Sequence, residues 1–150
     1  MSKQLFIPQV LYFNEFKNLE VINEVSQGWQ NRWTYIKKGT TEVKVWIFTT
    51  PRMQFSCVDY NNAIMIDSSP PVGSIHLSFI RTHGLCNTNH QKMYKHELVV
   101  VESGEETNFF ANQKNEIFSI VFEKSFFNTL FYQYFGDDFK KIRSNSRFFL

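Results

Sequence analysis

Short runs in which hydrophobic and polar residues alternate fill most of the chain from Trp29 onward. Alternation with a period of two is typical of β-strands, because successive side chains point to opposite faces of a sheet. Residues 42–50 and 53–60 carry the clearest pattern, and the tight connection at Pro51 and Arg52 predicts a hairpin. Further strands are predicted at residues 63–66, 72–80, 95–102, 108–111 and 117–122.

Strands this short and this closely spaced favour an antiparallel β-sandwich or barrel over a parallel α/β sheet. The fold class is therefore expected to be mostly β, with helices at the C-terminal end. In the strand at 42–50, Val45 and Ile47 face one side, while Trp46 and Phe48 face the other. Neither face is polar, so each face of the sheet needs a cover.

The predicted cover is a helix at residues 125–135, with Ser125 as its N-cap and Gly136 ending it in the left-handed conformation. Its apolar side chains recur with helical spacing, and two further Phe residues widen the apolar stripe beyond what one sheet requires. The stripe is either wedged deeply into the core or forms a subunit interface, since exposed aromatic patches often mark interfaces. The candidate dimerisation residues are Phe126, Phe127, Leu130, Phe131, Tyr134 and Phe135.

The two ends of the chain have weaker patterns. Leu19, Ile22 and Val25 recur every three residues, which allows a short helix near the N-terminus. A short helix is also predicted at residues 137–143, with acidic residues in its first turn and basic residues in its last, as the helix dipole favours. Residues 144–150 then have the character of a linker.

Length and composition indicate one domain. A chain of 150 residues with 43% hydrophobic content is expected to bury roughly 70% of its unfolded surface. Seventeen Phe, six Tyr and three Trp favour a thick core or an apolar cavity, because each aromatic side chain buries a large area. A net charge of +2 is too small to predict nucleic-acid binding by this chain alone.

The cysteines and the N-terminus indicate the compartment. Cys57 and Cys86 have no paired spacing, so neither a disulfide framework nor a thiolate metal site is predicted. Residues 1–10 lack the long apolar region of a secretory signal, and no run approaches the roughly 20 apolar residues that span a bilayer. We expect a soluble, cytoplasmic protein without a membrane partner.

Histidine spacing argues against a metal centre. A β-barrel metal site typically uses two His at i and i+2, because these positions face the same cavity. The four histidines, His76, His83, His90 and His96, contain no such pair. His83 and His90 flank the predicted loop 84–89 and are the remaining metal candidates, with solvated loop histidines as the alternative. We expect no metal and no cofactor.

Catalytic motifs are also missing from the sequence. There is no Gly-x-Ser-x-Gly elbow, no phosphate-binding glycine loop and no His-Glu-x-x-His helix. Cys57 has the position of a small core residue, and Glu105 and Glu106 follow Gly104 in a predicted exposed turn. No catalytic residue is predicted, and we expect the chain not to be an enzyme.

A ligand pocket remains compatible with the aromatic content. A cation that projects inward among aromatic side chains would pair with the carboxylate of an apolar ligand in a closed pocket. The alternative for each cation is a solvated surface position. The candidate pocket residues are Tyr35, Lys44, Trp46, Phe55, Phe79 and Arg81.

The order of segments resembles the regulatory domain of AraC-type transcription regulators. Members commonly have an aromatic strand ending in glycine, a long hairpin, an Asn-bearing turn, a Pro-x-Gly before a central strand, and a strand followed by Gly-Glu. Lys38 stands where a proline often precedes the first glycine. The matching segments here are residues 35–39, residues 42–60, Asn61 and Asn62 (suited to positive φ), residues 71–73 and residues 102–105.

This resemblance implies a cupin-like antiparallel β-sandwich or barrel followed by helices. It also implies effector sensing in the β part, homodimerisation through the helical part, and DNA binding only through a separate domain with two helix-turn-helix units. Residues 1–143 would then form the regulatory domain, and residues 144–150 would begin the linker to that absent domain. The alternatives are a cupin-type metal-dependent enzyme and a protein-interaction module without a ligand.

Overall fold

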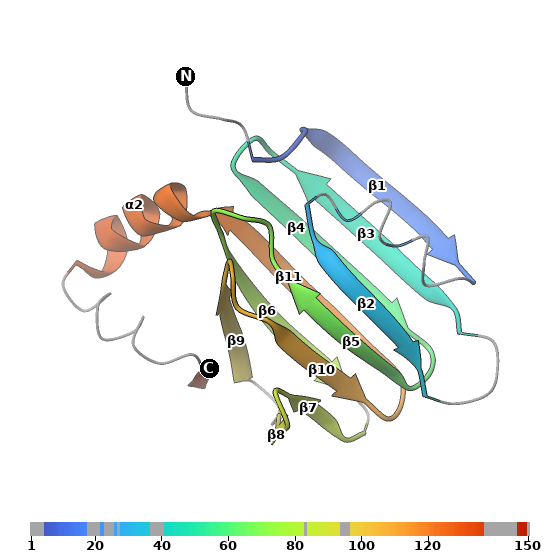
Figure 1. Ribbon diagram of the computed structural model, residues 1–150. Helices are drawn as coiled ribbons and strands as arrows, with labels where there is room; N and C mark the ends of the chain where they lie inside the picture. The colour runs from blue at the N-terminus through green and yellow to red at the C-terminus, as the bar shows by residue number, and fades with distance from the viewer. Residues whose placement is uncertain are drawn as a thin grey trace.

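Two antiparallel β-sheets face each other in the computed structural model, and one helix lies against the larger sheet (Figure 1). The structure describes residues 5–17, 22, 26, 28–36, 41–82, 84–93, 97–136 and 147–149. The larger, seven-stranded sheet has the order β1-β3-β4-β11-β6-β9-β12, and the smaller, five-stranded sheet has the order β2-β5-β10-β7-β8. The mostly β fold class is confirmed.

The strands of the larger sheet are β1 (Gln9–Phe16), β3 (Val43–Thr49), β4 (Met53–Tyr60), β6 (Ser74–Thr82), β9 (Glu97–Glu102), β11 (Asn115–Glu123) and β12 (Arg147–Phe149). Those of the smaller sheet are β2 (Gln30–Tyr35), β5 (Ile64–Ser69), β7 (Cys86–Thr88), β8 (Gln91–Lys92) and β10 (Thr107–Ala111).

The predicted hairpin is confirmed by β3 and β4, which pair from Val43–Tyr60 to Thr49–Gln54. The sequence pattern missed β1, which a bulged register pairs with β3. It also missed the β7–β8 hairpin, in which β7 lies inside the predicted loop 84–89 and β8 lies just after it. Strands of two or three residues are too short to show alternation, so their partners define them. The predicted helix near Ile22 falls largely outside the described residues, as do residues 137–146.

The residues with positive φ differ from those expected. Asn61 and Asn62 do not adopt it, whereas Asn89 and His90 do, in the β7–β8 turn. The Asn61 side chain instead accepts a hydrogen bond from the Glu42 backbone N–H at 2.8 Å. This contact ties the two ends of the β3–β4 hairpin together, so the asparagine contributes through its amide.

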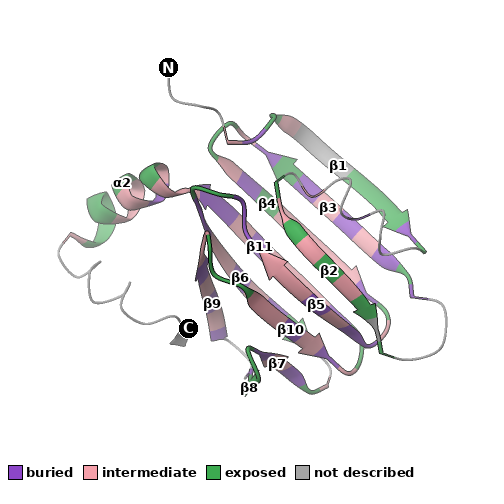
Figure 2. Cartoon of the chain, viewed as in Figure 1, coloured by how far each residue is buried: buried purple, intermediate pink, exposed green. Residues whose placement is uncertain are grey.

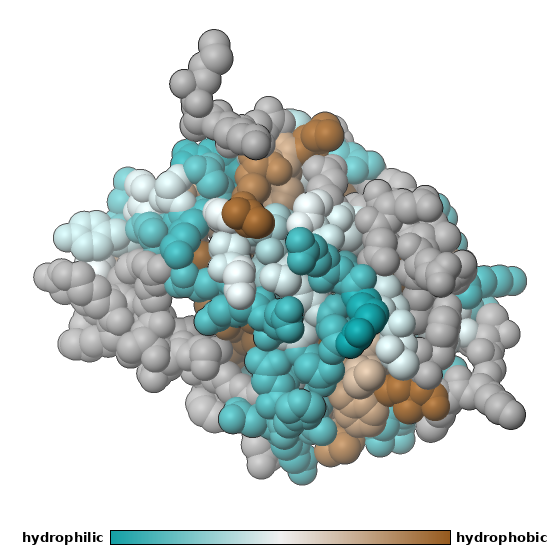
Figure 3. Space-filling model, in the orientation of Figure 1, coloured by the Kyte–Doolittle hydropathy of each residue, from teal (hydrophilic) through white to brown (hydrophobic). Residues whose placement is uncertain are grey.

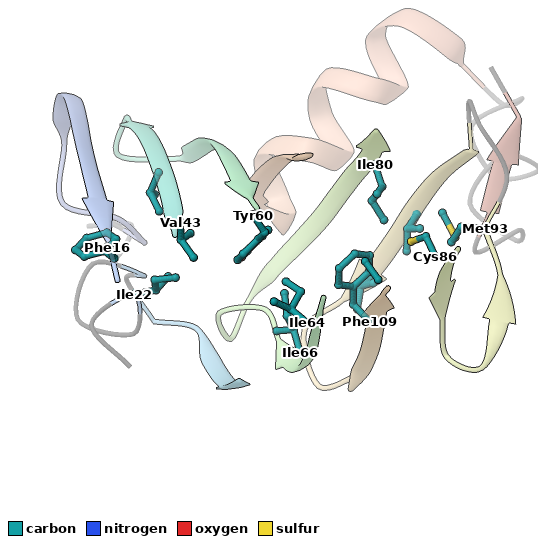
Figure 4. Packing of buried hydrophobic residues seen from close by; sticks show 14 of the residues in the cluster. Phe16, Ile22, Val43, Tyr60, Ile64, Ile66, Ile80, Cys86, Met93 and Phe109 are labelled. Atoms are coloured by element: carbon teal, nitrogen blue, oxygen red, sulfur yellow. The ribbon is translucent and has the colours of Figure 1, made fainter. Parts of the chain in front are cut away.

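The main core lies between the two sheets. Tyr60 and Ile80 of the larger sheet point toward Ile64, Ile66 and Phe109 of the smaller sheet (Figure 4). These side chains are buried, and fully burying one large aliphatic side chain stabilises the fold by roughly 1.5–3 kcal/mol. The core thus joins strands that are far apart in sequence.

Helix α2 (Lys124–Phe135) packs on the opposite face of the larger sheet. Its N-cap is Glu123 without a side-chain cap, so the predicted capping by Ser125 is wrong. The Ser125 hydroxyl instead donates to the Glu123 carboxylate. Gly136 ends the helix with a positive φ of 54°, as expected, but its ψ of −134° lies outside the left-handed helical region that was predicted. Its N–H donates a hydrogen bond to the Tyr132 carbonyl at 2.9 Å.

Aromatic residues cover the part of this outer face that lies beyond the helix. In the sheet register, Phe13 lies beside Trp46, with ring centroids 5.1 Å apart, and Phe79 lies beside Phe118, at 6.3 Å. Half-buried Cys57 separates the two pairs in the same row. We call this surface the outer aromatic belt, made of Phe13, Trp46, Phe48, Phe55, Phe79 and Phe118.

Candidate functional site: a neutral cavity between the sheets

A cavity of about 110 Å³ lies between the two sheets. Strands of both sheets line it, together with Trp29 and the preceding Ile22 and Ser26. None of its described lining residues is Asp, Glu, Lys or Arg. The polar lining residues are Ser26, Asn31, Gln54, Ser56, Ser68, His76, Ser78, Thr88, Thr107 and Ser119.

Polar side chains enter the cavity in two neighbouring rows across the larger sheet. Ser56, Ser119 and Ser78 are register partners on β4, β11 and β6. In the next row, Val121 separates Gln54 from His76. Residues i and i+2 of a strand share a face, so β4 and β6 each contribute one polar residue to each row. The polar groups are therefore gathered at one end of the cavity.

Gln54 is the most informative residue at this polar end. Its side chain is only 3% exposed, and its Oε1 accepts a hydrogen bond from Trp29 Nε1 at 3.3 Å. The indole N–H can only donate, so this contact fixes the orientation of the amide. Gln54 Nε2 is a buried donor without a hydrogen-bond partner, in a residue that lines the cavity.

His76 lies across Val121 from Gln54, and Trp29 contacts both residues. Its Nε2 is 3.1 Å from Ser119 Oγ, and the Trp29 ring meets its imidazole edge-on, with centroids 4.8 Å apart. Burial disfavours the charged imidazolium and lowers the pKa of His76 to about 4. The ring still borders the cavity, so at neutral pH it offers an uncharged hydrogen-bonding group.

The other end of the cavity is apolar. Val45, Val58, Ile117 and Ile80 form one cross-strand row there. Tyr60 closes this end, buried against the Trp33 ring at 5.9 Å. Burial raises its pKa well above the ordinary value, so the phenol stays neutral.

Five of the six predicted pocket residues lie outside this cavity. They face outward on the larger sheet: Lys44, Trp46, Phe55, Phe79 and Arg81. The two cations among them pair with Glu15 (2.9 Å) and Glu116. The Tyr35 side chain falls outside the described part of the structure. The prediction used the wrong phase of each strand, because it assigned the aromatic face of β3, β4 and β6 to the inside, whereas the face with Gln54, Ser56, His76 and Ser78 lines the cavity.

A signal for the true lining is nevertheless visible in the sequence. Gln54 and Ser56 occupy alternate positions of one apolar strand, and His76 and Ser78 do so in another. Ser119 adds a polar position to a third strand. Polar residues with a period of two in otherwise apolar strands indicate a wetted inner face.

The predicted dimerisation residues divide into two sets. Phe127 is buried, and Phe126, Leu130 and Phe131 pack against Phe122 and its neighbours on the sheet. These four belong to the second core, which is the alternative that the sequence left open. Tyr134 and Phe135 remain exposed together with Tyr132, in the last turn of α2, whose C-terminal end is exposed (Figure 2).

Other candidate chemistry is sparse in the described part of the chain. No three His, Cys, Asp or Glu residues converge there to form a metal site, and no helix there is long and apolar enough to cross a bilayer. His90 is exposed in the β7–β8 turn, while His83 and His96 are outside the described residues. Cys57 lies half-buried on the outer face rather than in the core, and burial raises its thiol pKa.

Searches of protein families and of curated proteins find no match. Among solved structures, the AraC-like transcriptional activator CuxR is similar with a TM-score of 0.51 and 11% identity, over 91% of this chain and 54% of its own. A cupin 2 conserved barrel protein from Leptotrichia buccalis has a TM-score of 0.45 and 10% identity, over 75% and 49%. A predicted oxalate decarboxylase from Thermotoga maritima has 0.43 and 12%, over 65% and 96%.

The chain spans about half the length of CuxR. The likeness to CuxR, at this low identity, shows a shared fold and leaves function open. The described residues form a mostly β, cupin-like sandwich of two antiparallel sheets with a C-terminal helix.

Proposed function

We propose that this domain binds a small-molecule effector between its sheets and is the sensing part of an AraC-type transcription regulator. The observation that carries the binding proposal is Gln54, a cavity-lining residue whose buried Nε2 has no hydrogen-bond partner. A buried donor without an acceptor costs about 1–3 kcal/mol, and a ligand oxygen would remove that cost. The order of sequence segments and the overall likeness to CuxR support the regulator assignment.

The strand that a ligand would touch leads directly into the helix. Ile117 and Ser119 of β11 line the cavity, whereas Ile120 and Phe122 of the same strand pack against α2. The helix begins at the residue after β11 ends. A ligand that shifts β11 therefore shifts the base of α2, and we propose this as the route from the cavity to the dimer.

We propose a homodimer formed through the outer aromatic belt and the exposed end of α2. Ion pairs within the chain neutralise the charged residues at the border of the belt. Such a surface suits a second copy of the same chain better than a charged partner. The opposite face of the molecule, over β2, β5 and β10, is largely hydrophilic with small separate hydrophobic spots (Figure 3).

Sedimentation velocity tests the dimer. We expect the wild type to sediment as a dimer and the Phe48→Ser/Phe55→Ser variant as a monomer, since both side chains are exposed on the belt. Val72→Ser, which changes an exposed residue outside the belt, should leave the dimer intact. A wild type that is monomeric at high concentration contradicts the proposal.

We propose that residues 1–150 do not recognise DNA themselves. The net charge of +2 supports this, because phosphate binding requires a concentrated basic surface. In the AraC-type assignment, a separate domain supplies DNA binding. Specific retardation of a promoter fragment by this chain alone in a gel-shift assay would contradict the assignment.

A thermal-shift screen of diverse small molecules tests effector binding. We expect at least one compound to raise the melting temperature of the wild type but not that of Val58→Phe, because the phenylalanine ring fills the cavity that Val58 lines. Val72→Phe is the matched control, since Val72 is 85% exposed. Ser78→Leu is a second filling variant if Val58→Phe does not fold. A screen without any such compound overturns the binding proposal.

We further propose that the domain is not catalytic. The cavity holds one histidine and no carboxylate among its described lining residues, so it lacks the separate acid and base that most hydrolytic and isomerising sites use. Elemental analysis of the purified protein is the direct test. Stoichiometric iron, manganese or zinc would favour a cupin-type enzyme instead.

A further inference from the structure

The chemistry of the cavity lining restricts the effector, on the assumption that the proposed binding function holds. We infer that the cavity takes an uncharged molecule about the size of one six-membered ring, mostly apolar, with an oxygen that accepts a hydrogen bond from Gln54 Nε2. This ligand class differs from the apolar carboxylate expected when Lys44 and Arg81 were placed inside.

The charge of the ligand follows from the lining. The described lining contains no Lys or Arg that could pair with an anion and no Asp or Glu that could pair with a cation. Its two titratable residues, His76 and Tyr60, are both neutral at physiological pH. An ion would have to leave water without compensation, which should weaken its binding by about a hundredfold or more relative to a neutral analogue.

The accepting oxygen follows from the orientation of the Gln54 amide. Trp29 Nε1 already donates a hydrogen bond to Gln54 Oε1 at 3.3 Å, so the amide oxygen has a partner and the amide nitrogen does not. The unpartnered Nε2 needs an acceptor. The serine hydroxyls in the neighbouring row can donate or accept and so accommodate a carbonyl, an ether or a hydroxyl group at this end.

The size and the apolar body follow from the rest of the cavity. Its volume of about 110 Å³ is close to that of an engineered cavity of about 150 Å³ that binds benzene. The end away from Gln54 is lined by aliphatic residues and by Trp33, Tyr60 and Phe109. A single ring fits this space with its oxygen toward Gln54, whereas a dinucleotide or a long acyl chain does not.

Three probes of similar shape test the inference: acetophenone, which is neutral with an acceptor, isopropylbenzene, which lacks the oxygen, and benzoate, which is anionic. Changes in Trp29 and Trp33 fluorescence report binding, since both indoles line the cavity. We expect acetophenone to bind with a dissociation constant of about a millimolar or tighter, and benzoate at least about a hundredfold more weakly.

Gln54→Met should weaken acetophenone binding by about tenfold and leave isopropylbenzene unchanged, because only the first ligand uses the amide N–H. Gln113→Met, at an exposed position, is the matched control. If Gln54→Met does not fold, NMR of the wild-type glutamine side-chain N–H groups replaces it. Acetophenone should then shift the Gln54 signals, and isopropylbenzene should not.

Benzoate binding within tenfold of acetophenone overturns the inference. So does an equal loss of both neutral ligands in Gln54→Met, or no saturable binding of acetophenone. An anionic compound that binds the wild type but not Val58→Phe would overturn the ligand class and leave the sensing function standing. If no compound distinguishes the wild type from Val58→Phe, both proposals fail.

Discussion

The two faces of the larger sheet are built by the same strands but differ in chemistry. Burial alone would predict apolar residues inside and polar residues outside, whereas polar side chains line part of the inner face and aromatic side chains lie on the outer face. In β4, Gln54, Ser56 and Val58 face the cavity, whereas Phe55 and Cys57 face outward. Apart from Tyr60 at the apolar end, the cavity-lining residues of this sheet are small, aliphatic or polar, whereas the outer face holds the aromatic belt. The difference teaches that the larger sheet leaves room for the cavity with its smaller side chains, while most of the aromatic lining comes from Trp29 and from Trp33 and Phe109 of the smaller sheet.

The charged residues follow the same division. One row across the outer face consists of charged register neighbours: Glu15, Lys44, Asp59, Glu116 and Arg81. The side chains of Lys44, Glu15 and Arg81 are exposed in this row, and the cations form ion pairs with Glu15 and Glu116. The corresponding lining of the cavity is neutral, so the two faces differ in dielectric environment as well as in side-chain size.

The largest expected effect comes from placing a charge on each face. Val45→Asp puts an unpaired carboxylate at a position that is 1% exposed, which should lower the free energy of unfolding by more than about 4 kcal/mol. Phe48→Asp, on the outer face of the same strand, should lower it by about 1 kcal/mol. Urea denaturation measures both. Equal losses would contradict the assignment of inner and outer faces.

The second largest effect is expected from α2, where one residue packs against the outer face of the sheet and another is exposed. Phe127→Ala removes a buried ring from the second core and should cost about 3–5 kcal/mol. Tyr134→Ala, on the same helix but 77% exposed, should cost less than about 0.5 kcal/mol. Thermal unfolding of the two variants tests this. Similar melting temperatures would show that α2 does not dock as described.

The third effect uses pH to probe the inner face. The pKa of His76 falls from 6.5 to about 4 on folding, so between these values the unfolded chain binds a proton that the folded chain does not. Stability is therefore full above about pH 6.5 and decreases as the pH falls toward about 4. The loss is at most about 3 kcal/mol, and the partial exposure of the ring reduces it.

Urea denaturation at about pH 7 and about pH 4.5 measures this loss, and His76→Gln should remove most of it. Two carboxylates also lose stabilisation in acid. Hydrogen bonds from Asn108 and Arg32 lower the pKa of Asp67. Those from Arg52 and Ser125 lower the pKa of Glu123. Their contribution appears at lower pH and persists in His76→Gln. An unchanged pH dependence in the variant would place His76 in water.

In the smallest expected effect, a substitution on the outer face lowers the free energy of unfolding more than one on the inner face. Ser78→Ala, on the cavity side, should change the free energy of unfolding by less than about 0.5 kcal/mol. Phe79→Ala, one residue away on the outer belt, should cost about 1–2 kcal/mol, because Phe79 packs against Phe118. Chemical denaturation resolves the two. A larger loss for Ser78→Ala would mean that the inner hydroxyl holds the sheets together.

Local chemistry by itself determined much of the secondary structure of this protein. Alternation predicted β3 and β4 almost to the residue, and the apolar stripe and Gly136 predicted α2 and its end. These features depend on contacts within a few residues of one another, and the sequence contains them directly. The aromatic excess likewise indicated a cavity or a thick core before the partner of each face was known.

Tertiary structure alone decided which face of each strand is enclosed. The pleat gives every strand two faces, but the inner one is set by β2, β5 and β10, which come from distant parts of the chain. For that reason Trp46 and Phe79 were predicted inside and lie outside, while Gln54 and His76 were overlooked and form the polar end of the cavity. A shift of one residue in phase exchanges the whole set of site residues.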